Sequence, residues 1–266
     1  MAQELPPFFI YGAVAAIPAY YFSYWIFEKV LIPRFFTLSF NQRLKNLEDK
    51  KLVLFMTIFP STVHAFFHVF GVPPWITFGY STAHNAAKIA YYDDHWPAFF
   101  QGVFAGYMVA DYSKCGFKTL GIAFTVHHVF AMAAWTLSAY LRSMQWQTAL
   151  LQFCELSTIF MNLRQLLLTA GYASDGAAVT VVSLIFMISF FAVRVVPLPM
   201  ILRELFLTGF VDMRDKDGLF FALCGAGFTM LHAALQLMWF SIMMKKLFSV
   251  VLGNDKKKEK DGKKQK

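Results

Sequence analysis

Two adjacent histidines lie in the middle of an apolar run of the chain. The stretch FTVHHVFAMAAW, residues 124–135, contains His127 and His128 and no other ionisable residue. A buried neutral imidazole can act first as a general base and then as a general acid. The alternative is a structural role, in which both rings only complete hydrogen bonds inside a core. Because neighbouring positions on a helix point about 100° apart, only one of the two rings can face a given partner.

A polar stripe follows in the run at residues 148–170. Intervals of three, three, four and three residues separate Gln152, Glu155, Thr158, Asn162 and Gln165. At about 100° per residue these positions share one face of a helix whose other faces are apolar. Such a face lines a wet cavity or bonds to neighbouring membrane helices. Glu155 favours the cavity, since a buried carboxylate needs a partner or a proton.

Other apolar runs also contain ionisable residues, among them Asp111, Arg194 and His232. A charged side chain inside a bilayer costs roughly 2.5–3.5 kcal/mol on insertion scales, so such residues face a bundle interior and mark functional sites. We expect Arg194 to bind a lipid phosphate or to pair with Asp111 or Glu155.

Metal and cofactor sites are not expected. His64 and His68 lie one helical turn apart, a spacing typical of metal ligands and of the H-x-x-x-H box of di-iron membrane hydroxylases. The H-x-x-H-H box of those enzymes is missing, because Phe124 stands three residues before His127. The three cysteines have no C-x-x-C spacing, which argues against a zinc cluster or a disulfide framework. The sequence therefore predicts no metal and no bound cofactor.

The composition indicates the solvent in which these residues lie. Of 266 residues, 58% are hydrophobic and 15% are charged, whereas about 25% are charged in a typical soluble domain. A helix needs about 20 mostly apolar residues to cross a bilayer. The apolar runs predict an all-α membrane protein with seven transmembrane helices, at residues 8–28, 52–71, 97–112, 119–141, 148–170, 178–201 and 219–243.

The distribution of Lys and Arg predicts the orientation of these helices. The first loop has five basic residues between positions 34 and 51, and the segment from Lys245 has nine lysines. An odd number of spans places both on one side. We therefore expect a lumenal N-terminus and a cytosolic C-terminus. The net charge of +8 comes mostly from this tail, which favours contact with anionic lipids over nucleic acid. Lys263 and Lys264 resemble the dilysine signal by which a retrieval coat returns membrane proteins to the endoplasmic reticulum (ER).

Four motifs together resemble the TLC-domain family, which includes the TRAM proteins, the ceramide synthases and the neuronal ceroid lipofuscinosis ER protein. They are GYMVADY at 106–112, VHHVF at 126–130, CELSTIFMNLRQLL at 154–167 and FFAVR at 190–194. The TLC-domain-containing subgroup is the most similar. His127, His128 and Ser157 match a catalytic pattern of the ceramide synthases, and Glu155 replaces an Asp of that pattern. Cys154 and Thr158 depart from it.

The resemblance implies an architecture and a set of site residues. Six helices would form a barrel-like bundle around a central cavity, with the first helix outside it. The divisions would be an N-terminal helix with a basic loop (1–51), a TLC domain (52–245) and a Lys-rich tail (246–266). The candidate catalytic residues are His127, His128, Glu155 and Asp111. The candidate lipid-binding residues are Ser157, Thr158, Asn162, Arg194 and His232.

Two functional classes remain open. The first is an ER enzyme of lipid metabolism that transfers an acyl group from acyl-CoA to a sphingoid base or a phospholipid through the His pair. The second is a non-catalytic protein of lipid binding, lipid transport or ER cargo export, in which the same residues bind a headgroup or hold the bundle together. Membrane lipids are the expected partners in both.

Overall fold

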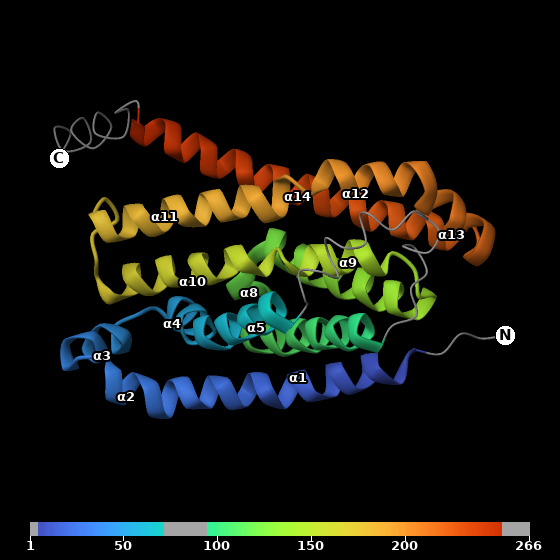
Figure 1. Cartoon of the computed structure of the whole chain (residues 1–266). Coiled ribbons are helices and arrows are strands. Elements are labelled where there is room, and N and C mark those ends of the chain that lie inside the picture. The colour runs from blue at the N-terminus through green and yellow to red at the C-terminus, as the bar shows by residue number, and fades with distance from the viewer. Residues whose placement is uncertain (1–4, 72–94, 252–266) are drawn as a thin grey trace.

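The structure is a computed structural model that describes residues 5–71 and 95–251. These residues form helices that lie side by side along one long axis, without a strand (Figure 1). The elements are α1 (Pro7–Ile26), η1 (Phe27–Leu31), α2 (Ile32–Phe35), α3 (Leu38–Lys45), α4 (Asp49–Met56), α5 (Ile58–Gly71), α8 (His95–Leu141), α9 (Gln145–Gln152), α10 (Glu155–Ala170), α11 (Ala177–Phe190), η3 (Phe191–Val195), α12 (Leu198–Glu204), η4 (Leu205–Gly209), α13 (Phe210–Asp217) and α14 (Leu219–Val251), where η marks a π-helical turn.

Five helices of the described chain are long and apolar enough to cross a membrane. They cover Pro7–Phe35, Asp49–Gly71, Gly121–Leu141, Ala177–Leu207 and Leu219–Ser249. The two other expected runs are helical as well, and they form the first part of α8 and the pair α9 and α10. α10 has only 16 residues and carries four of the five residues of the polar stripe, which explains why it falls short on length and hydropathy.

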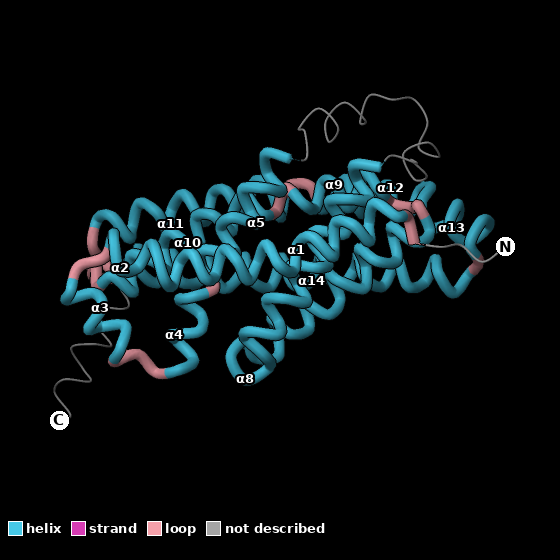
Figure 2. Tube along the Cα trace, turned by 90° about the horizontal axis from the view of Figure 1, so that it is seen from below, coloured by secondary structure: helices cyan, strands magenta, loops and turns pink. Residues whose placement is uncertain are grey.

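Two glycines divide α8 into two arms. Gly116 has φ 63° and ψ 170°, and Gly121 has φ 75° and ψ 174°. Only glycine adopts this backbone region readily. The arms, residues 95–115 and 122–141, pack against each other, as the stacked rings of Phe104 and Trp135 show with centroids 4.7 Å apart. The labelled part of α8 projects from the side of the bundle in Figure 2.

α1 lies at one edge of the bundle and packs closely against the first arm of α8 (Figure 1). The contact is close because Gly102 and Gly106 have the G-x-x-x-G spacing that lets membrane helices approach. A Cβ on Gly102 would overlap the backbone carbonyl of Phe9, and one on Gly106 would overlap that of Ala13. The first helix, expected outside the bundle, is therefore an edge helix fitted to α8.

The boundaries of three expected segments need correction. The run at 148–170 is broken at Phe153 and Cys154, so that Glu155 begins a new helix, α10. The expected loop at 202–218 is mostly helical, since it contains the end of α12, then η4 and α13. The sixth run, predicted at 178–201, is interrupted at Val196 and Pro197, after the π-helical turn η3, and continues as α12.

Candidate functional site

A cavity of about 490 Å³ lies within the bundle. Its walls come from α4, α5, both arms of α8, α10, α11, η3 and α14. The residues predicted as catalytic all line it: Asp111, His127, His128 and Glu155. Apolar side chains, including Phe124, Phe186, Phe190, Trp239 and Met161, form much of the remaining wall. The cavity thus combines a polar wall with room for an apolar ligand.

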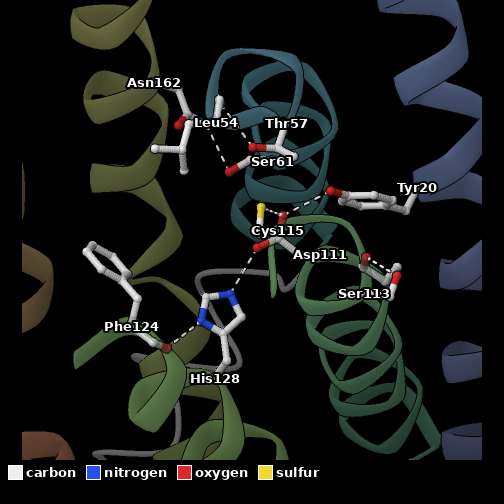
Figure 3. A network of polar contacts seen from close by, with 11 residues as sticks. Tyr20, Leu54, Thr57, Ser61, Asp111, Ser113, Cys115, Phe124, His128 and Asn162 are labelled. Atoms are coloured by element: carbon white, nitrogen blue, oxygen red, sulfur yellow. Dashed lines mark hydrogen bonds and ion pairs between the residues drawn. The ribbon is translucent and has the colours of Figure 1, made fainter. Parts of the chain in front are cut away.

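His128 has both ring nitrogens occupied (Figure 3). Its Nδ1 lies 2.8 Å from the carbonyl oxygen of Phe124, which can only accept, so Nδ1 carries a proton and donates. Its Nε2 lies 3.0 Å from Oδ2 of Asp111. The shared proton lies on the imidazolium or on the carboxyl group, and in either state neither nitrogen is available to a substrate. His128 is held in place by its partners.

Asp111 is held in turn by α1. The Tyr20 hydroxyl donates to Oδ1 of Asp111 at 3.0 Å in a buried contact (Figure 3). The thiol of Cys115 lies 3.9 Å from the same oxygen. Tyr20 is not among the residues predicted from the sequence, although the buried positions of α1 suggest how it could be found. They recur every three or four residues, at Phe9, Gly12, Ala16, Tyr20 and Ser23, and they mark one packing face.

His127 has no hydrogen bond to any residue that the structure describes. Its ring stands at 88° to that of His128, with the centroids 5.8 Å apart. It contacts the ring of Trp239 at 5.3 Å. It lines the large cavity and also a second cavity of about 60 Å³. Of the two histidines, His127 is therefore the one whose imidazole remains free to react.

Arg194 reaches the large cavity from η3. Its Nε donates to Ser157 Oγ at 2.7 Å and its Nη2 to Thr158 Oγ1 at 3.1 Å. Its Nη1 lies 3.4 Å from Oε1 of Gln236. Of the two alternatives for Arg194, the ion pair with Asp111 or Glu155 is not formed. Asp111 pairs with His128 instead, and Glu155 interacts with Arg194 only at longer range.

The other predicted lipid-binding residues separate into two places. Ser157, Thr158 and Asn162 line the large cavity, whereas His232 lines the second cavity. Asn162 also connects two helices, since its side-chain amide donates to Ser61 and Thr62 of α5 at 3.0 Å each. His232 is linked to the Arg194 network, because its Nε2 lies 3.3 Å from Nε2 of Gln236.

His64 and His68 lie outside the lining of both cavities. Their ring centroids are 4.3 Å apart, and His64 stacks on Tyr107 at 3.7 Å. Both rings are buried between α5 and α8. Within the described ranges, no group of three or more His, Cys, Asp or Glu side chains is arranged to hold a metal ion.

The comparison with known families agrees with this geometry. The model of the TLC domain matches residues 49–245. The chain belongs to the TLC-domain family. No curated protein and no solved structure matched it significantly. Every residue that lines the large cavity lies inside the TLC domain, whereas Tyr20 precedes it. The family and the apolar helices make this a multi-pass, lipid-related membrane protein.

Proposed function

We propose that this TLC-domain protein resides in the ER membrane, binds a lipid in the large cavity and transfers an acyl group through His127. The observation that carries the proposal is the free imidazole of His127 in a cavity wall that also holds Glu155 and the His128–Asp111 pair. An unbonded imidazole inside a water-poor cavity is suited to nucleophilic catalysis.

The proposed reaction has two steps. A ring nitrogen of His127 bonds to the carbonyl carbon of an acyl thioester, the C–S bond breaks, and the leaving thiolate takes the proton that the imidazole loses. A hydroxyl or amine of the acceptor lipid then attacks the carbonyl carbon of the acyl-imidazole to form an ester or amide. The C–N bond to the ring breaks, and the acceptor's proton goes to the ring nitrogen that leaves. Glu155 lines the same cavity and is the carboxylate available to pass this proton. His128, fixed by Asp111, supports the wall beside the reacting ring.

The test is a direct assay of the purified protein in lipid nanodiscs. We expect that acyl-CoA produces a mass increase of one acyl group on His127 and that a sphingoid base or a lysophospholipid discharges it. The His127→Ala protein should do neither while it still folds. An unmodified His127, together with no acylated product from either acceptor, would reject acyl transfer.

A second candidate function is lipid binding or transport, or ER cargo export, without catalysis. Its support is that most polar groups of the wall bond to one another, as Arg194 does to Ser157 and Thr158 and Asn162 does to Ser61. In this case the purified protein retains a lipid but shows no turnover in the same assay.

The proposed topology has seven spans, a lumenal N-terminus and a cytosolic C-terminus. The odd number of spans is supported by the directions of the helices, because α1 and α14 run the same way along the long axis and α11 runs the opposite way (Figure 1). The choice of the lumenal side rests on the distribution of Lys and Arg. The proposed ER retrieval residues, Lys263 and Lys264, lie outside the described residues.

A further inference from the structure

Arg194 is a buried cation whose hydrogen bonds all go to neutral groups. Arg194 has a relative exposure of 9%. Its three acceptors are the hydroxyls of Ser157 and Thr158 and the amide oxygen of Gln236. Arg194 makes no ion pair with any described residue. Glu155, in the same cavity wall, interacts with Arg194 only at longer range. Charges inside a membrane protein normally find a counter-charge or bind one, and no described carboxylate bonds directly to this guanidinium.

The neutral contacts leave part of the guanidinium available. A guanidinium carries five N–H groups in one plane, and three are used by the contacts described above. Ser157 and Thr158 hold one edge of the fork, and the group lies 5.3 Å from the centre of the Phe190 ring. The fork is therefore fixed in orientation before any ligand arrives. Since Arg194 lines the large cavity, its remaining donors are within reach of a ligand there.

The backbone also presents Arg194 in an unusual way. The residue lies in η3, a π-helical turn between α11 and the prolines that follow. Single π-helical turns inside helices occur frequently at functional sites, because the extra residue redirects the side chains. Arg164 offers a comparison. It lies on the regular helix α10, bonds to Ser183 of α11 and does not line the cavity.

We propose that Arg194 binds a phosphate group of the cavity's ligand. A planar fork of donors matches phosphate oxygens in a bidentate contact, and such charge-assisted bonds are strong in a water-poor site. The phosphate has two chemical sources, the headgroup of a phospholipid and the phosphates of acyl-CoA. The inference rests on the proposed function only in that the cavity binds a lipid or an acyl donor. It requires no acyl transfer.

The experiment measures ligand affinity of the protein in dodecyl maltoside micelles, whose headgroups carry no phosphate. The probes are phosphatidic acid, palmitoyl-CoA and diacylglycerol, of which the last has the chains of the first without its phosphate. We expect Arg194→Gln to weaken the binding of at least one phosphate-bearing probe by about 10- to 100-fold, and that of diacylglycerol by less than about threefold. Arg164→Gln removes an arginine that lies away from the cavity, and it should leave the affinities for all three probes unchanged. The probe that Arg194→Gln weakens identifies the source of the phosphate.

Two results would overturn the proposal. The first is wild-type affinity of Arg194→Gln for both phosphate-bearing probes. The second is an equal loss for diacylglycerol, which would make Arg194 a structural residue. If Arg194→Gln does not fold, Arg194→Lys keeps the charge without the planar fork and should weaken the preference for phosphate without abolishing it. An unchanged preference in Arg194→Lys also rejects the proposal. Because the readout is binding, a phosphate site without turnover would reject only acyl transfer.

Discussion

Oδ2 of Asp111 lies 3.0 Å from Nε2 of His128, although the two residues are 17 positions apart within α8. In a straight helix this separation would be about 25 Å. The contact exists because Gly116 and Gly121 leave helical geometry and fold the two arms against each other. The bend in α8 at Gly116 and Gly121 therefore brings Asp111 and His128 together at the cavity.

The two histidines should respond differently to substitution. His127→Ala should lower acyl transfer at least about 100-fold with little change in thermal stability, because His127 has no hydrogen bond to the described protein. His128→Ala leaves the buried side chain of Asp111 without its imidazole partner. We expect the free energy of unfolding to fall by about 3–5 kcal/mol. Turnover and thermal unfolding of the detergent-solubilised variants measure both effects. Equal stability losses in the two variants would contradict the assignment of different roles.

Tyr20→Phe tests the link between α1 and the site. The variant keeps the ring, which packs against Tyr107 with centroids 5.7 Å apart, and removes only the hydroxyl bonded to Asp111. A buried hydrogen bond to a charged group contributes about 1.5–3 kcal/mol, so the unfolding midpoint should fall. Tyr21→Phe is the matched control, because the Tyr21 hydroxyl makes an exposed contact with Ser113. Similar midpoints for the two variants would show that the Tyr20 hydroxyl does not support Asp111.

Gly102→Ala should destabilise the protein, whereas Gly227→Ala should not. A methyl group at Gly102 overlaps the Phe9 carbonyl and forces α1 and α8 apart, which costs about 1–3 kcal/mol. At Gly227 a Cβ meets nothing within 4 Å, so alanine should stabilise α14 by up to about 1 kcal/mol. Thermal unfolding of the two variants compares them directly, and the expected effects have opposite signs.

The seven-span topology predicts different fates for tags at the two ends. After selective permeabilisation of the plasma membrane, protease should remove a C-terminal tag and leave an N-terminal tag protected in the lumen. Full permeabilisation should expose both tags and serves as the control. Identical behaviour of the two ends after the selective step would require an even number of spans.

Changing Lys263 and Lys264 to serine should shift the protein from the ER toward later compartments of the secretory pathway. The reason is the match of these lysines to a retrieval signal that is read in the cytosol. Microscopy with compartment markers measures the shift, and Lys256 and Lys257 changed in the same way are the control. An unaltered distribution would place ER retention in the membrane spans.

Much of the fold could be predicted from local pattern. Apolar runs indicated the membrane helices, because a bilayer requires long apolar segments with internally bonded backbones. Polar spacing indicated that Thr158, Asn162 and Gln165 share a face, and these three residues line the cavity. Gln152 was assigned to the same stripe but lies in α9, because the chain breaks at residues 153–154 and the helical phase does not continue.

The sequence by itself determined which polar residues had to face the interior, because leaving them in lipid is too costly. Only the tertiary structure decided which of them became partners. Tyr20 and Asp111 bond across two helices. Arg194 bonds to neutral acceptors and not to Asp111 or Glu155, with which an ion pair was one of two alternatives. Burial depends on local periodicity, whereas partnership depends on the register between helices. That register is decided by the glycine contacts between α1 and α8 and by the bend in α8. Both join residues far apart in the sequence, whereas a periodic pattern describes only residues a few positions apart.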